Sequence, residues 1–153
     1  MTVLRAVSTG SFGVRPATPV DLITVREMLE GADLPTEGVE QHLQNVLVGE
    51  VDGVIVAAAG LEVAGTAGLV RSVVVRPDRR SGGRGGEIVR ALLNEADAQG
   101  FTELFLLTTT ATTFFDRLGF REVSRESAPL AIQQTQEFLT LCPSSAVCMR
   151  RGV

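Results

Sequence analysis

The segment from Arg76 to Leu93, RPDRRSGGRGGEIVRALL, places the strongest constraint on how this chain can fold. It sets five arginines and four glycines directly after the apolar run LVRSVVV, and its second half follows a helical pattern. Glycine allows backbone N–H groups to converge on one concave surface, and the start of a helix carries partial positive charge. The segment therefore predicts a strand–turn–helix unit whose turn binds a phosphate or pyrophosphate group.

Two common phosphate-binding motifs do not fit this turn. A nucleotide-hydrolysing P-loop needs a lysine followed by serine or threonine, and all 14 basic residues of the chain are arginine. The dinucleotide fingerprint G-x-G-x-x-G is also not met. An arginine-rich surface loop that only caps the helix is the plain structural alternative.

The remaining pattern predicts a mixed α/β sheet within one domain over residues 1–153. Asp52-Gly53 between two apolar runs predicts a hairpin turn, and Gly100 ends the helix that follows the arginine-rich turn. A meander followed by a strand–helix–strand crossover produces such a sheet. The expected strands are 12–16, 47–51, 54–63, 65–75, 101–110, 120–123 and 146–152, and the expected helices are 18–31, 36–47, 86–100 and 111–119, with 127–143 locally helical and then irregular.

Composition narrows the class of protein. The net charge of −4 argues against broad nucleic-acid binding, and no apolar run approaches the ~18 residues that span a bilayer. The first residues lack the apolar centre of a signal peptide, so we expect a soluble cytoplasmic protein. Cys142 and Cys148 lie far in sequence from His42, the single histidine, so no metal site is expected. Two reduced thiols are the expectation, and a redox or soft-metal pair is the alternative.

Two motifs, found in the same order, carry a family resemblance. Arg80-Ser81-Gly82-Gly83-Arg84-Gly85 resembles the (Gln/Arg)-x-x-Gly-x-(Gly/Ala) motif of the GCN5-related N-acetyltransferases, the GNAT family. The preceding VVVRPDRR and the later FFDRLGF are similar to that family's fourth strand and its F-Y-x-x-x-G-F segment. The resemblance implies a GNAT fold with two splayed parallel strands, and it implies acetyl-CoA as the acyl donor.

The C-terminal third carries narrower resemblances. LLTTTATTFFDRLGF and APLAIQQTQEFLTLCPSSAVCMRR together resemble the arsenic-resistance N-acetyltransferases. The first of the two is also similar to the acetyltransferase domain of N-acetylglutamate synthases. Both resemblances imply the α-amine of a small amino-acid-like acceptor, such as glutamate or a phosphorus- or arsenic-bearing analogue of it.

The resemblance also implies roles for individual residues around the cosubstrate. Backbone groups of Val73 and Val75 would bind the pantetheine arm, and the N–H of Val73 or Val74 would polarise the thioester carbonyl. Phe115, with Phe114, would pack against that arm or the core. The residues expected to hold the pyrophosphate are Arg80, Ser81, Gly82, Gly83, Arg84, Gly85 and Gly86.

The acceptor amine needs a proton acceptor, and Glu62 near the end of a strand is the candidate, with a solvent-facing strand residue as its alternative role. Arg71 and Ser72 are candidates to hold an acceptor carboxylate, although Arg71 fits a structural ion pair equally well. Many family members carry a tyrosine at the position of Phe115 to protonate the leaving thiolate, and this chain has no tyrosine. We expect no dedicated acid, or a substitute such as water, Thr113 or Cys142.

Three functions are compatible with these residues. The leading one is an enzyme that acetylates a small amine, with no metal, no nucleic-acid partner and no membrane. The missing tyrosine leaves open a non-catalytic acyl-CoA-binding sensor, and an enzyme acting on protein or peptide amines is the third. A homodimer formed through the C-terminal strands is also compatible. His42 is expected to be an ordinary helix residue.

Overall fold

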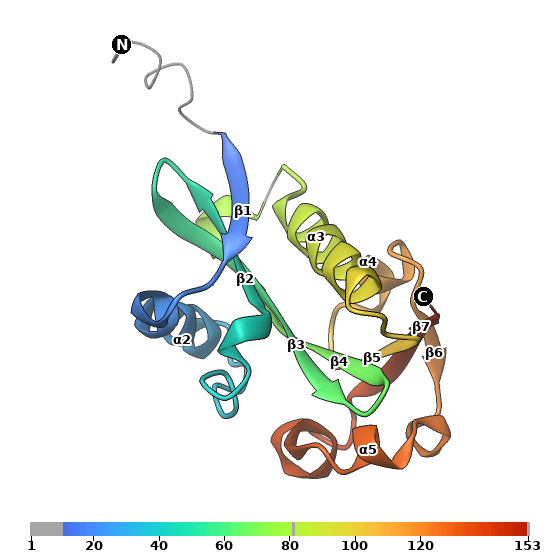
Figure 1. The fold of residues 1–153 in the computed structure, drawn as a ribbon. Helices are drawn as coiled ribbons and strands as arrows, with labels where there is room; N and C mark the ends of the chain where they lie inside the picture. The colour runs from blue at the N-terminus through green and yellow to red at the C-terminus, as the bar shows by residue number, and fades with distance from the viewer. Residues whose placement is uncertain (1–10, 81, 153) are drawn as a thin grey trace.

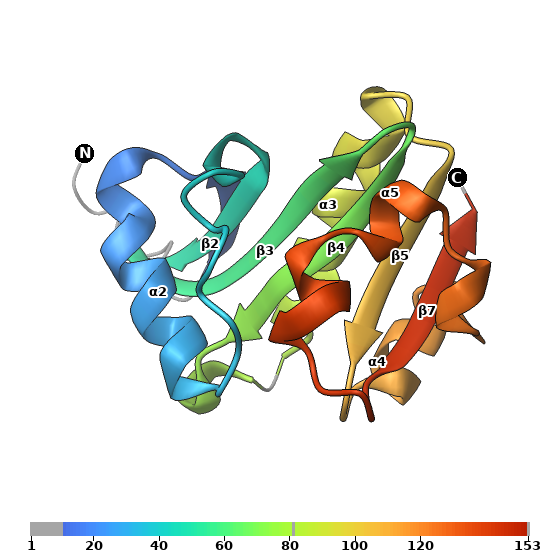
Figure 2. The same cartoon turned by 90° about the horizontal axis from the view of Figure 1, so that it is seen from below.

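The structure is a computed structural model that describes residues 11–80 and 82–152. These residues form a seven-stranded mixed sheet in the order β1-β2-β3-β4-β5-β7-β6, in which only the β4–β5 pair is parallel. Helices cover both faces of the sheet (Figures 1 and 2). The elements are β1 (Phe12–Pro16), α2 (Leu22–Gly31), β2 (Val46–Val51), β3 (Val54–Ala64), β4 (Ala67–Val75), α3 (Arg84–Ala98), β5 (Glu103–Thr108), α4 (Thr112–Asp116), β6 (Arg121–Val123), α5 (Leu130–Gln133) and β7 (Val147–Gly152).

The helix α3 covers one face of the sheet together with α4 (Figure 2). Its buried residues recur every three or four positions, so they form one apolar stripe along the helix. Burying each large member of such a stripe contributes about 1.5–3 kcal/mol. The stripe is the predicted one and consists of Ile88, Val89, Leu92, Leu93 and Ala96. This packing fixes the start of α3, and with it the glycine-rich turn, against the end of β4.

Two separate apolar clusters cover the other face. One joins α2 to the sheet through Val25 and Leu29, and the other joins the segment after β6 through Ile132 and Phe138. Figure 2 shows both segments on the near face of the sheet, with parts of β3 and β4 running between them. The candidate site lies between these two segments.

Local turn chemistry explains several element boundaries. Asp52 and Gly53 have φ angles of 52° and 78°, which confirms the predicted tight hairpin turn. The backbone N–H of Thr18 donates to the Asp21 carboxylate at 2.7 Å just before α2, as expected for a capping interaction. α2 ends at Gly31 and α3 is followed by Gly100 at φ 85°, both as predicted.

The helix predicted over residues 36–47 is wrong. The segment forms turns and a single 3-10 turn at Leu43–Asn45 before β2 begins at Val46. Gly38 adopts φ 89°, and a Cβ atom there would lie 2.8 Å from the Arg71 guanidinium. The segment instead wraps around Arg71 and offers it the Glu37 carbonyl, so a tertiary contact overrides the helical pattern.

Asp21 is predicted to be an acid-sensitive contributor to stability. Hydrogen bonds from Arg15 lower the pKa of its carboxyl from 3.8 to about 2. Its contribution is therefore present above about pH 4 and is lost as the pH falls towards 2. Because Arg15 is 36% exposed, we expect Asp21→Asn to cost only about 1–2 kcal/mol of unfolding free energy at pH 7. Urea unfolding at pH 7 and pH 2.5 measures this, with the exposed Asp97→Asn as the control; an equal cost at both pH values contradicts it.

Within the described ranges, no helix combines the length and the apolar character required to cross a bilayer.

Candidate active site

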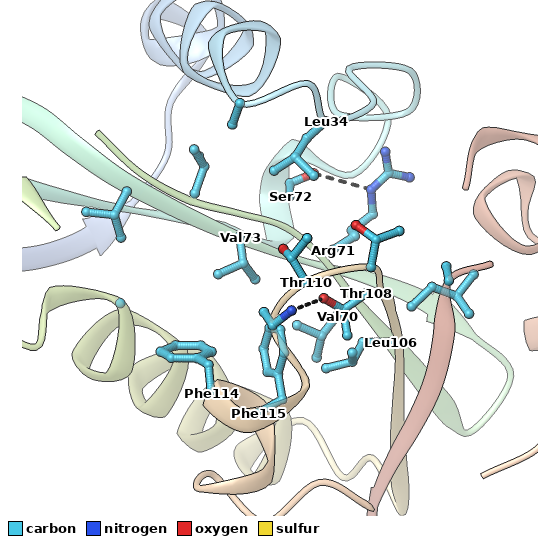
Figure 3. Close-up of a pocket in the computed structure, with 18 of the residues that line it drawn as sticks. Leu34, Val70, Arg71, Ser72, Val73, Leu106, Thr108, Thr110, Phe114 and Phe115 are labelled. Atoms are coloured by element: carbon cyan, nitrogen blue, oxygen red, sulfur yellow. Dashed lines mark hydrogen bonds between the residues drawn. The ribbon is translucent and has the colours of Figure 1, made fainter. Parts of the chain in front are cut away.

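A cleft opens where β4 and β5 separate. The two strands pair only between Ala67–Leu69 and Glu103–Phe105. Beyond this pairing, residues 70–75 and 106–111 line a cleft with a volume of about 870 Å³ (Figure 3). The splayed parallel strands that the resemblance implied are therefore present.

A bulge in β4 sets which groups face this cleft. Gly60 pairs with Arg71 and Ala58 with Val74, so two residues of β4 oppose the single residue between Gly60 and Ala58. Ser72 has φ 59°, the left-handed region that non-glycine residues rarely adopt. Beyond the bulge, Val73 and Val75 pack on the α3 face, whereas Val74 packs with α2.

The backbone direction along β4 follows from one hydrogen bond. The N–H of Arg76 donates to the Val56 carbonyl of β3 at 2.8 Å. Hydrogen-bonding direction alternates along a strand, so the backbone of Val74 also faces β3, and that of Val73 and Val75 faces the cleft. Arg80 Nε donates to the Val75 carbonyl at 3.0 Å, which agrees with this direction. Two cleft-facing residues of β4 are thus available to an extended ligand.

The glycine-rich turn closes one end of the cleft. Gly82 and Gly83 have φ angles of 99° and 77°, and Gly83 immediately precedes α3. The first N–H groups of an α-helix have no intrahelical acceptor, and Gly85 and Gly86 both lie on the cleft wall. Arg80 lies there too. The turn therefore combines N–H groups, a helix N-terminus and positive charge, which fits the pyrophosphate of a CoA molecule.

The other predicted members of this turn are placed differently. Arg84 donates to the Arg79 carbonyl at 3.4 Å, so its side chain braces the turn from within. Gly82 lies beside that side chain, because a Cβ atom there would be 3.2 Å from the Arg84 guanidinium. Ser81 lies outside the described residues.

Arg71 organises the opposite end of the cleft. The residue is 5% exposed, and its guanidinium contacts three groups from three segments. Nη1 lies 2.9 Å from Glu62 Oε1, Nε lies 3.2 Å from Glu137 Oε2, and Nη2 donates to the Glu37 carbonyl. Nε also lies 3.4 Å from Ser72 Oγ (Figure 3). The ion-pair role weighed for Arg71 in the sequence is therefore the one this structure displays.

Glu137 is the residue that sequence reasoning missed. It begins a π-helical turn (Glu137–Leu141), is 5% exposed and lies on the cleft wall. Burial raises the pKa of its carboxyl above the ordinary value, against the opposing attraction of Arg71. One signal was available, since Glu137 is the only charged residue between Glu126 and Arg150.

Glu62, the predicted base, occupies the far side of Arg71. Its side chain is 14% exposed, so it is not the solvent-facing residue of the alternative. His42 Nε2 lies 3.6 Å from the same carboxylate, and the His42 side chain is 27% exposed. His42 lies in the turn before β2 and not in a helix. Glu62 and His42 thus lie on the side of Arg71 away from the cleft lining, whereas Glu137 contacts Arg71 from the cleft wall.

The aromatic pair of α4 forms part of the cleft floor. Phe115 is buried and meets Phe114 and Phe120 edge to face, at centroid distances of 4.9 and 5.7 Å. A Cβ atom at Gly85 would lie 3.4 Å from the Phe114 ring, so the ring packs against the start of α3. Both phenylalanines line the cleft while belonging to the core (Figure 3). Thr113, on the same helix, is exposed.

Three features therefore follow one another along the length of the cleft. A phosphate-binding turn lies at one end, a bare strand edge follows in the middle, and a buried cluster of one arginine and two carboxylates closes the other end. Such an arrangement suits a long ligand that is anionic at one end and meets a second molecule at the other.

Known proteins are similar to this chain in sequence. Residues 42–122, more than half of the chain, match the acetyltransferase (GNAT) domain. An amino-acid acetyltransferase from Pseudomonas fluorescens is 37% identical over 97 residues, which cover 62% of this chain and 22% of that protein. A homologue of the same name from Ectopseudomonas mendocina is 35% identical over the same length. The chain thus spans about a fifth of the length of these relatives.

Solved structures agree with the fold. N-acetylglutamate synthase from Neisseria gonorrhoeae, complexed with coenzyme A and N-acetyl-glutamate, superposes with a TM-score of 0.79 over 92% of this chain and 35% of that one, at 21% identity. Rv2747 from Mycobacterium tuberculosis, in complex with CoA, gives 0.78 over 92% of this chain and 99% of that one, at 23% identity. Identities this low show the fold alone. With the domain match over residues 42–122, they lead to one conclusion: the chain belongs to the GNAT acetyltransferase family.

Proposed function

We propose that the chain is a single acetyltransferase domain that transfers the acetyl group of acetyl-CoA to the α-amine of a small amino-acid-like acceptor. The observation that carries this proposal is the continuous cleft from the glycine-rich turn to the Arg71 cluster. Both molecules then meet in one ternary complex, and the amine attacks the thioester directly.

The residues on the cleft wall fit the cosubstrate. N–H groups at Gly83, Gly85 and Gly86, with Arg80, would hold the pyrophosphate. The cleft-facing backbone of Val73 and Val75 would bind the pantetheine amides as an added strand. Acetyl-CoA supplies the activated acyl group when it is bound.

The bulge favours Val73 over Val74 as the donor to the thioester oxygen. The Val74 backbone faces Ala58 of β3, whereas that of Val73 faces the cleft. A backbone donor of this kind is worth about 2.7–4 kcal/mol of transition-state stabilisation in other enzymes. The left-handed Ser72 thus orients the donor.

The proposal also specifies the class of acceptor. The relatives named amino-acid acetyltransferases, and the N-acetylglutamate synthase neighbour, support an amino acid, with glutamate as the first choice. The arsenic-resistance resemblance extends the choice to arsenic- and phosphorus-bearing glutamate analogues. Arg71 is already paired with Glu62 and Glu137, so the acceptor end of the cleft offers carboxylates to an ammonium group.

Protonation of the leaving thiolate is assigned to water. Phe115 has no acidic group, and Thr113 is exposed beyond the cleft wall. Burial and the nearby Glu137 raise the pKa of the Cys142 thiol to about 12. An ordinary thiol has a pKa of about 8.5, so proton transfer from Cys142 to the leaving thiolate would be unfavourable.

An acceptor panel tests the proposal. Thiol release from acetyl-CoA is followed with L-glutamate, its phosphinic and arsenic analogues, other amino acids, a polyamine and a peptide. We expect release above the no-enzyme rate with free amino acids and not with the peptide. Tight acetyl-CoA binding with no release on any amine identifies the sensor, and release with the peptide alone identifies a protein acetyltransferase.

A further inference from the structure

The two carboxylates on Arg71 are not equivalent. Glu62 projects from β3 and reaches Nη1 from behind Arg71, with His42 as its other neighbour. Glu137 approaches Nε from the C-terminal segment and lines the cleft beside Cys142. Only one of the two carboxylates therefore lies where an acceptor molecule can reach it.

We propose that Glu137 is the general base that takes the proton from the acceptor's ammonium group, and that Glu62 is a positioning residue that acts through Arg71. This inference rests on the proposed function. The Glu137 carboxylate accepts one proton from the ammonium, directly or through a water molecule. The neutral nitrogen then bonds to the acyl carbon, the carbon–sulfur bond breaks with its electron pair on sulfur, and the second nitrogen proton neutralises the thiolate through water.

The contacts of Glu137 hold it in place for this role. Arg71 Nε lies 3.2 Å from its Oε2, and the Cys142 thiol donates to its Oε1 at 3.4 Å. Two partners fix the plane of the carboxylate, and further lone pairs on both oxygens stay available to a ligand. The π-helical turn that Glu137 begins is a kind of irregularity often found at functional sites.

The charges that face Glu137 suit a proton acceptor. Burial raises the pKa of its carboxyl, Arg71 from β4 and the Cys142 hydrogen bond lower it, Glu62 from β3 raises it, and the net direction is upwards. A raised pKa brings the base closer to that of the amine, which improves proton transfer. The Cys142 thiol, with its own pKa raised to about 12, stays neutral beside it. Both carboxylates of the cluster therefore pair with Arg71, and of the two only Glu137 also lines the cleft.

The test compares Glu137→Gln with Glu62→Gln in the full chain. Both variants keep the side-chain shape and leave Arg71 one carboxylate, so thermal unfolding is expected to show both folded. Initial rates are measured with acetyl-CoA and L-glutamate from pH 6 to 9.5, and acetyl-CoA affinity is measured by calorimetry. For Glu137→Gln we expect kcat to fall about 100-fold at pH 7, with the loss shrinking towards pH 9.5 where the amine ionises unaided.

The other outcomes separate this inference from the proposed function. Glu62→Gln is expected to lose less than about 10-fold, with a pH profile parallel to that of the wild type. Equal losses for both variants at every pH, or weakened acetyl-CoA binding in Glu137→Gln, would show a structural role and overturn the inference. A wild-type protein that acetylates no amine of the panel overturns both proposals, whereas an active wild type with a fully active Glu137→Gln overturns this one alone.

Discussion

Replacing Arg71 by methionine is expected to lower the unfolding free energy by about 3 kcal/mol at pH 7, with much of that loss recovered near pH 4. The substitution removes the cation between Glu62 and Glu137 while keeping much of the side chain's apolar volume. Glu137 is left as a buried carboxylate without its ion-pair partner, which costs more than the pair itself contributes. Burial already raises the pKa of Glu137, and loss of Arg71 raises it further.

The direction of the pH dependence follows from that pKa. A carboxyl group whose pKa is higher in the folded protein than in the unfolded chain destabilises the fold at high pH. The penalty disappears as the pH falls below the unfolded value of about 4.3, because the buried group becomes neutral in both states. The variant should therefore be relatively most stable at mildly acidic pH.

Urea unfolding between pH 4 and 8 measures the effect. The control is Arg26→Met, which breaks the Arg26–Glu40 pair at 3.2 Å between side chains that are 42% and 66% exposed. Exposed pairs contribute at most about 1 kcal/mol, so the control should change little. An Arg71→Met penalty as small as that of the control, or one that grows as the pH falls, would contradict the role given to this cluster.

Replacing Gly83 by alanine is expected to weaken acetyl-CoA binding at least about 10-fold, equivalent to about 1.4 kcal/mol. Gly83 has φ 77°, which costs any L-residue with a side chain about 1–2 kcal/mol. The turn can relieve this strain only by rotating the N–H groups that the pyrophosphate needs. The loss of affinity therefore tests directly whether the glycine-rich turn binds the pyrophosphate of acetyl-CoA.

Gly100 offers a matched control for this substitution. It has φ 85°, and a Cβ atom at either glycine would meet no other atom within 4 Å. Gly83→Ala and Gly100→Ala should therefore destabilise the fold by similar amounts, while only the first raises the dissociation constant measured by calorimetry. Equal affinities in the two variants would show that the turn at Gly83 does not bind the cosubstrate.

Features of the fold that depend on neighbouring residues were predictable from the sequence. The Asp52-Gly53 turn and the apolar stripe of α3 depend on a few adjacent positions, and both are confirmed. The prediction of a helix over residues 36–47 was wrong because the contact between the Glu37 carbonyl and Arg71, distant in sequence, outweighs the local helical pattern. Local propensity carries no information about that partner.

The candidate site divides in the same way. The glycine-rich turn is one continuous segment, so its motif is recognisable from the sequence alone. The bulge at Ser72 was not, because serine gives no sign of adopting φ 59°. The pairing of Arg71 with Glu62 and Glu137 joins segments 9 and 66 residues apart, and the choice between the two carboxylates requires knowing which one faces the cleft.

We propose that this cleft acetylates the α-amine of a free amino acid. Incubation with acetyl-CoA carrying a deuterated acetyl group, and with ¹⁵N-labelled L-glutamate, followed by mass spectrometry, tests it most directly. We expect a product with the intact deuterated acetyl group on the labelled nitrogen, formed at a rate that Glu137→Gln reduces about 100-fold at pH 7. Labelled glutamate recovered without the acetyl group, at enzyme concentrations that saturate acetyl-CoA binding, would contradict it.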